Sequence, residues 1–430
     1  LTDLLVLCST KINIKMFCSL GSNYKEETKQ YDIFNSNVNL TLDLDLQPPE
    51  LMKQMDDDTG NPNHAYFDTP EGKLHYRSYF PDNIKGMKAV VIWQHGISAH
   101  SGSVVKITNP GDEGDVQYTN MGLFSRKLKE NNIGLYALDM FGHGYSEGKR
   151  FYIPNGDWKI NRDHLEKFAR FVNQLHENVP LFLAGDSYGG CLVLHVARLW
   201  QDLNEHLEKK KGDGFADHDH DDGDGVFSTM ENGQSYPTLS TPPKEFKGIM
   251  LNAPAIIGDL PPWPVRIILM YILAPMIPES TPFFMPHPIS PERIWRDDFV
   301  RKRLSSEYVK KLGLAGGAVP FRLGTATGVV KALLDVQNEV IPKFNVPFCV
   351  CHGSKDYGVP VSGTEYLVDH CATKKENYRS VGAKKTVVYT TILEFAQNRR
   401  ADDDSRNPRI VVYTTIPQSY IPLDSQHCRL

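Results

Sequence analysis

A serine between two glycines is the part of this sequence best suited to chemistry. Residues 185–189 are Gly-Asp-Ser-Tyr-Gly, and they follow the apolar residues 181–184, which are typical of a buried strand. A strand that turns sharply into a helix forces the middle residue of the turn into a strained conformation, and the flanking positions must then be small. This spacing therefore predicts that Ser187 is a nucleophile, held out at the carboxyl edge of a sheet over the positive end of a helix.

The chain contains a second match to the same spacing, around Ser146 at residues 144–148. The residues after it have no helical periodicity and include Pro154. After Ser187, in contrast, apolar residues lie nearly all round the expected helix, which is typical of a helix packed against a sheet. These residues are Cys191, Leu192, Leu194, Val196, Ala197, Leu199 and Trp200. We therefore assign the nucleophile position to Ser187.

Acyl transfer by a serine also needs a base and an acid that orients the base. Asp356 is the candidate acid, because it follows the apolar residues 346–352 after a short turn and lies between the nucleophile and the C-terminus. An aspartate that only forms a turn is the alternative. Asp186 is a weaker candidate, since its side chain should point to the other face of the elbow. Asp139 is expected to brace the loop at residues 142–146.

The remaining parts of the site are the oxyanion donors and the base. The backbone N–H groups of Tyr188, directly after the nucleophile, and of Ile97, after an earlier apolar strand, are the candidate donors. The base is expected just after the last strand, which we predict at residues 385–391. His427 is the only histidine in the last part of the chain and is the candidate base. A terminal residue without a catalytic role is the alternative for His427.

The order of elements predicts how these residues are brought together. Apolar, strand-like segments alternate with segments that have helical periodicity, which predicts a doubly wound, mostly parallel sheet. A Pro-rich excursion between two strands predicts a helical cap over the carboxyl edge of the sheet. The expected organisation is a partly disordered lead-in at residues 1–64 and one domain at 65–430, with a disordered insertion at 208–245 and a cap at about 255–342.

Composition excludes several classes of function. The net charge is −5 without a long basic cluster, so we expect no nucleic-acid partner. The seven cysteines are scattered without metal-binding spacing, which predicts reduced thiols in an intracellular compartment and no metal or other cofactor. His218 and His220 in the insertion could hold a metal adventitiously. Because no apolar run reaches about 18 residues, we expect a cytoplasmic protein without a membrane-spanning helix, with peripheral contact to membranes as an additional expectation.

Five motifs, in order between residues 70 and 370, give the chain a resemblance to a known family. It resembles the monoacylglycerol lipase branch of the α/β-hydrolases, also called the serine aminopeptidase S33 or hydrolase-4 family. The motifs are His95-Gly96 with Ser98-x-His100-Ser101-Gly102, Asp139-x-x-Gly142-His143-Gly144-x-Ser146-x-Gly148, Gly185-Asp186-Ser187-Tyr188-Gly189-Gly190, Leu251-Asn252-Ala253-Pro254, and Val346-Pro347 running through His352-Gly353-Ser354-x-Asp356-x-x-Val359-Pro360.

The resemblance implies an α/β-hydrolase fold and a Ser–Asp–His esterase with a mobile, partly apolar cap and acyl-glycerol or other acyl-ester substrates. It places Ser187 and Asp356 in the triad, and Ile97 and Tyr188 at the oxyanion positions. The chain departs from the family in two ways. The family commonly has His or Gln where Asp186 stands, and the family histidine that follows the last strand is missing.

We therefore predict a serine hydrolase of monoacylglycerol-like or lysophospholipid-like esters. The apolar run at residues 263–278 would be part of the cap and would line an acyl channel or touch a membrane. One alternative is a peptidase that removes small N-terminal residues, which would need an acidic pair in the cap, with Glu292, Asp297 and Asp298 as candidates. The other alternative is an inactive binding protein that lacks the base.

Overall fold

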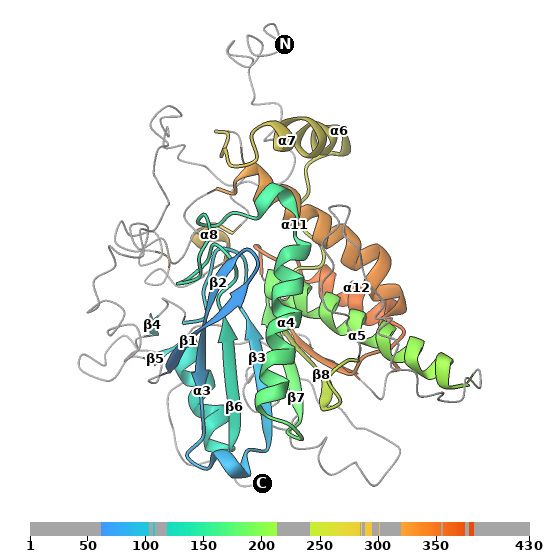
Figure 1. Ribbon diagram of the computed structural model, residues 1–430. Helices are drawn as coiled ribbons and strands as arrows, with labels where there is room; N and C mark the ends of the chain where they lie inside the picture. The colour runs from blue at the N-terminus through green and yellow to red at the C-terminus, as the bar shows by residue number, and fades with distance from the viewer. Residues whose placement is uncertain are drawn as a thin grey trace, which may run out of the picture. The chain divides into compact units, whose positions relative to one another are not determined.

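The structure is a computed structural model (Figure 1). It describes residues 62–102, 106–107, 118–212, 241–283, 285, 289–294, 301, 320–353, 356–374 and 378–381. The predicted lead-in up to residue 61, most of the predicted insertion and the predicted last strand at 385–391 lie outside the described residues.

An eight-stranded sheet with the order β1-β2-β6-β3-β7-β8-β9-β10 forms the centre of the described domain. β1 is antiparallel to β2 and β2 to β6, while every other neighbouring pair is parallel. The strands are β1 (Asn63–Thr69), β2 (Gly72–Tyr79), β3 (Ala89–Gln94), β6 (Ile133–Leu138), β7 (Leu181–Asp186), β8 (Phe246–Asn252), β9 (Phe348–Cys351) and β10 (Tyr378–Val381). A separate pair is formed by β4 (Lys106–Ile107) and β5 (Tyr118–Thr119).

Helices cover both faces of this sheet, which is why its central strands are apolar on both sides. In β3, Val90 and Ile92 belong to the core that also contains Phe168 of α4 (Lys159–Leu175). Val91 belongs instead to the core that contains Phe124 of α3 (Asn120–Glu130). The prediction of a doubly wound, mostly parallel sheet is confirmed, and the strand order with its helices is that of the α/β-hydrolase fold.

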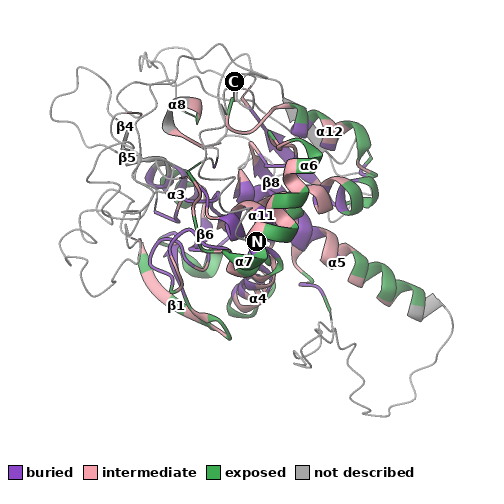
Figure 2. Cartoon of the chain, turned by 90° about the horizontal axis from the view of Figure 1, so that it is seen from above, coloured by how far each residue is buried: buried purple, intermediate pink, exposed green. Residues whose placement is uncertain are grey.

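The remaining described helices follow the sheet strands or lie between β8 and β9. They are η3 (Ile84–Gly86), η4 (Pro154–Gly156), α5 (Tyr188–Gly212), α6 (Trp263–Ile267), η5 (Ile268–Leu273), α7 (Ala274–Met276), α8 (Pro291–Ile294), α11 (Leu323–Asp335), η6 (Val336–Val340), η7 (Ile341–Lys343) and α12 (Ser362–His370). In Figure 2 the central strands of the sheet are buried, whereas the edge strand β1 is partly exposed and α6 carries exposed residues. None of the helices in the described ranges is long and apolar enough to cross a membrane.

Candidate active site

The turn between β7 and α5 has the strained backbone that the glycine spacing predicts. Ser187 has a φ of +51°. A Cβ atom on Gly189 would lie 2.2 Å from the carbonyl oxygen of Gln94, and one on Gly185 would lie 2.6 Å from the backbone of Gly189. The Ser187 N–H donates to the carbonyl of Asn252 at 3.1 Å. Both glycines are therefore required by close backbone packing, and this packing fixes the position of Ser187.

The peptide between Gly96 and Ile97 is held by a histidine. Nδ1 of His95 lies 2.7 Å from the carbonyl oxygen of Gly96, and Nε2 lies 3.0 Å from the N–H of Met140. Nε2 accepts that N–H, so Nδ1 carries the proton and donates, and burial lowers the pKa of His95 and keeps the ring neutral. Because C=O and N–H point in opposite directions across a trans peptide, the Ile97 N–H points away from His95.

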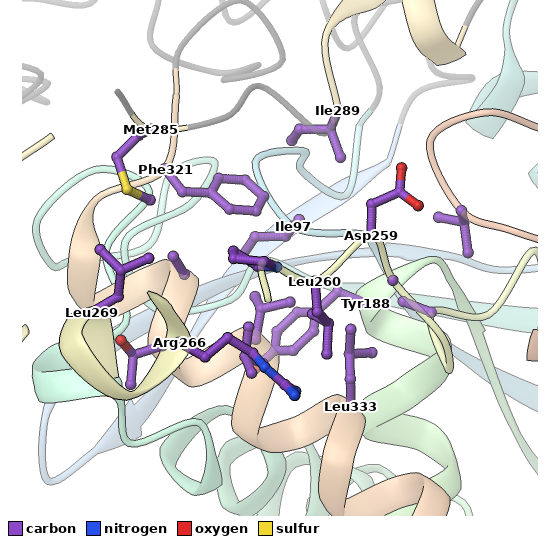
Figure 3. A pocket seen from close by; sticks show the side chains of 18 of the residues that line it. Ile97, Tyr188, Asp259, Leu260, Arg266, Leu269, Met285, Ile289, Phe321 and Leu333 are labelled. Carbon is purple, nitrogen blue, oxygen red and sulfur yellow. The ribbon is translucent and has the colours of Figure 1, made fainter. Parts of the chain in front are cut away.

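Ser187 lines an apolar cavity of about 130 Å³. Figure 3 shows other side chains that line this cavity. Ile97 and Tyr188, whose N–H groups are the predicted oxyanion donors, line the same cavity. Most of the other lining side chains come from the segment between β8 and β9, and they include Leu260, Leu269, Met270, Met285, Ile289, Phe321, Leu323, Val329, Val330 and Leu333. The geometry can therefore hold a long apolar group with one end beside a serine hydroxyl.

Asp356 lies in the loop after β9, beside this cavity. Its Oδ1 accepts the N–H groups of Gly358 at 2.9 Å and Val359 at 2.8 Å, and both of these residues line the cavity. These two hydrogen bonds fix the orientation of the carboxylate. Its Oδ2 lies 3.7 Å from Nε2 of His352. The structure thus brings the candidate acid and the candidate nucleophile to the edge of one cavity.

The candidate base, His427, lies outside the described residues. His352 is near Asp356, but both of its ring nitrogens have partners: Nε2 donates to the carbonyl of Val359 at 2.9 Å, and Nδ1 is 2.7 Å from the hydroxyl of Thr364. Burial lowers its pKa. His352 therefore braces the loop of Asp356, and no histidine of the described ranges lines the cavity.

The carboxyl group of Asp186, next to Ser187 in the chain, has a raised pKa. Burial raises the pKa of its carboxyl to about 7, although the N–H groups of Gly96 and of Asp186 itself lower it in part. The carboxyl is therefore neutral below about pH 7 and places no full negative charge beside Ser187 in that range. The departure from the family at this position is thus compatible with a nucleophile.

Sequence reasoning alone does not find the contacts that join the segment between β8 and β9 to the loop of Asp356. Arg293 of α8 donates to the carboxylate of Asp259 at 2.6 Å and to the carbonyl of Tyr357 at 2.8 Å. Asp259 lines the cavity. No local sequence signal marks this pair, because its partners are far apart in the chain and in irregular segments. Two candidates for an acidic pair, Asp297 and Asp298, lie outside the described residues, as do His218 and His220.

Comparison with known proteins supports the α/β-hydrolase fold. Residues 117–207, which include β7 and the elbow, match the model of the family "Serine aminopeptidase, S33" (Hydrolase_4). This match confirms the family resemblance over that segment. Together with the sheet order and the elbow, it supports an α/β-hydrolase fold for this chain.

Two curated proteins are similar to shorter parts of the chain. One is an uncharacterized abhydrolase domain-containing protein of Dictyostelium discoideum, 32% identical over 107 residues, which are 25% of this chain and 9% of that protein. The other is caffeoylshikimate esterase of Arabidopsis thaliana, 27% identical over 132 residues, which are 30% of this chain and 34% of that protein. The matched regions thus span no more than about a third of either relative.

Among solved structures, the chain is similar to a soluble variant of monoglyceride lipase from Saccharomyces cerevisiae. The identity is 17% and the TM-score 0.49, over 78% of this chain and 94% of that one. It is also similar to monoacylglycerol lipase of Paleococcus ferrophilus, with 15% identity and a TM-score of 0.47, over 75% and 98% of the two chains.

Proposed function

We propose that this chain hydrolyses carboxylic esters of the monoacylglycerol or lysophospholipid type through an acyl-enzyme on Ser187. The observation that carries the proposal is the opening of a strained elbow serine into an apolar cavity. In this mechanism Ser187 Oγ attacks the ester carbonyl while a base takes its proton. The N–H groups of Ile97 and Tyr188 stabilise the oxyanion, the alcohol leaves, and water then releases the acid.

Asp356 is proposed to orient the base, and His427 is the proposed base. The paired N–H donors of Gly358 and Val359 support this role for Asp356, because they fix its carboxylate next to two residues that line the cavity. A peptidase acting on small N-terminal residues would need a carboxylate free to bind the substrate amine. The carboxylate that lines the described cavity, Asp259, is already paired with Arg293, which favours an ester substrate.

Active-site labelling and substrate chain length test this proposal together. We expect a fluorophosphonate probe to label the peptide that contains Ser187. For 4-nitrophenyl esters we expect kcat/KM to rise by about fourfold per CH₂ until the cavity is filled, from about 0.8 kcal/mol for each buried CH₂. An aminoacyl arylamide serves as the control and should not be turned over. Failure to label Ser187 would instead support the inactive binding protein.

We also propose that the cap contacts a lipid surface. Large apolar side chains are exposed along α6, η5 and α7, including Trp263 at 69%, Tyr271 at 65% and Met276 at 61% exposure. Exposed aromatic and aliphatic side chains on one short helical segment are typical of an interfacial anchor.

Sedimentation with phosphatidylcholine vesicles tests the lipid contact. The double variant Trp263→Ala/Tyr271→Ala should bind such vesicles about tenfold more weakly than the unchanged protein, because it buries less apolar area in the bilayer. The matched control is Tyr66→Ala on β1, whose side chain is 51% exposed. Equal binding by the double variant and the control would contradict the proposal.

A further inference from the structure

The cavity that contains Ser187 has an ionised side chain for which an acyl chain provides no partner. Arg266 of α6 lines this cavity and is partly buried. Figure 3 shows its side chain extending from the ribbon toward Leu333, among apolar side chains. An arginine is charged at all ordinary pH values and has five N–H donors, which are available here to solvent or to a ligand.

Within the described part of the chain, no hydrogen bond or ion pair is made by the Arg266 guanidinium. Other arginines of these ranges do have acceptors. Arg150 donates to the carbonyl of Gly144 at 2.7 Å, and Arg322 donates to the carbonyl of Glu279 at 2.6 Å. In contrast to Arg150 and Arg322, Arg266 has no acceptor for its guanidinium among the described residues.

The acidic side chain that lines the cavity is already paired with another arginine. Asp259 is the carboxylate among the described lining residues, and its Oδ2 lies 2.6 Å from the guanidinium of Arg293. Since Asp259 is paired with Arg293, Arg266 is the charged side chain of the described cavity wall that has no ion-pair partner among these residues. In a cavity with few other polar groups, such a charge is screened less than it would be at the surface.

We propose that Arg266 forms an anion subsite, so that the ester cleaved at Ser187 carries a phosphate or carboxylate group in addition to its apolar chain. The planar guanidinium matches both anions, which can accept two parallel N–H donors. This proposal rests on the proposed ester hydrolysis and narrows its substrates to anionic acyl esters. The anion can be in the alcohol, as in a lysophosphatidate, or at the far end of the acyl chain, as in a half-ester of a dicarboxylic acid.

Equilibrium binding in a Ser187→Ala background tests the subsite without requiring turnover. Two pairs of ligands are compared at concentrations where each is monomeric: dodecanoyl glycerol phosphate with dodecanoyl glycerol, and monomethyl dodecanedioate with methyl dodecanoate. We expect the anionic member of at least one pair to bind about tenfold more tightly, and this preference to disappear in Arg266→Met. Arg266→Lys should retain part of it, because the charge remains while the bidentate geometry is lost.

The matched control is Lys331→Met, which removes the same charge from an exposed position on α11 that does not line the cavity. The pair of ligands for which Arg266→Met loses the preference for the anionic member identifies whether the anion is in the alcohol or in the acyl chain. An unchanged preference in Arg266→Met, or no preference in the parent protein, would overturn the subsite and would show that Arg266 only covers apolar surface with its stem. Failure of the ester hydrolysis itself is a separate result, because it appears as absent labelling of Ser187.

Discussion

Replacement of Ser187 by alanine is expected to lower kcat/KM for ester hydrolysis by about 10⁴-fold or more, because the covalent step loses its nucleophile. The free energy of unfolding should change little. The described residues make no hydrogen bond to the Ser187 hydroxyl, while the backbone contacts that hold the elbow remain in the variant. Initial rates with a medium-chain 4-nitrophenyl ester and urea unfolding curves measure the two quantities.

Ser146 provides the matched control, because it lies in the same glycine spacing. The structure buries it: its hydroxyl donates to the carbonyl of Asp139 at 2.7 Å and accepts the N–H of His75 at 2.9 Å. Ser146→Ala should therefore lower the free energy of unfolding by about 1–3 kcal/mol and leave the probe labelling at Ser187. Probe labelling that persists in Ser187→Ala and is lost in Ser146→Ala would reverse the assignment.

The elbow could be predicted from the sequence because its cause is local. Gly185 and Gly189 are required by atoms that any tight strand-to-helix turn brings close, so the spacing itself contains the information. The parallel sheet was predictable for a similar reason, since strands covered on both faces are apolar throughout. β1 (Asn63–Thr69) has no comparable signal in the sequence, because it is an edge strand with polar and partly exposed residues.

The walls of the cavity could not be predicted, because they depend on contacts between distant and irregular segments. Arg266 and Arg293 are both basic residues of the cap, and nothing in their neighbourhoods in the sequence distinguishes them. Only the fold shows that Arg293 has an aspartate partner, whereas Arg266 has none among the described residues. The role of His427 stays a prediction, since it lies outside the described residues.

A buried carboxylate, Asp139, connects the loops beside the Gly96–Ile97 peptide, as its position after a strand predicts. Its Oδ1 accepts the N–H of Ser101 at 2.6 Å, and its Oδ2 accepts the N–H of Tyr145 at 3.1 Å. Oδ2 also lies 2.7 Å from Nδ1 of His75 and 3.6 Å from Arg77. Burial alone would raise the pKa of Asp139, but the hydrogen bond from His75 and the positive charge of Arg77 outweigh it and hold the pKa well below its usual range.

Replacement of Asp139 by asparagine is therefore expected to lower the free energy of unfolding at pH 7 by about 3–5 kcal/mol, because it leaves the buried Arg77 without a counter-charge. A carboxyl with a lowered folded-state pKa stabilises the protein above its unfolded pKa, and this stability is lost as the pH falls through the folded value. The difference in the free energy of unfolding between the unchanged protein and Asp139→Asn should thus shrink only below about pH 4.

Asp202→Asn is the matched control, since the pair of Asp202 with Arg198 is half exposed on α5. This variant should lower the free energy of unfolding by at most about 1 kcal/mol. Urea unfolding from pH 7 down to pH 3 measures all three proteins, and an equal, pH-independent cost for the two variants would show that Asp139 does not hold these loops together.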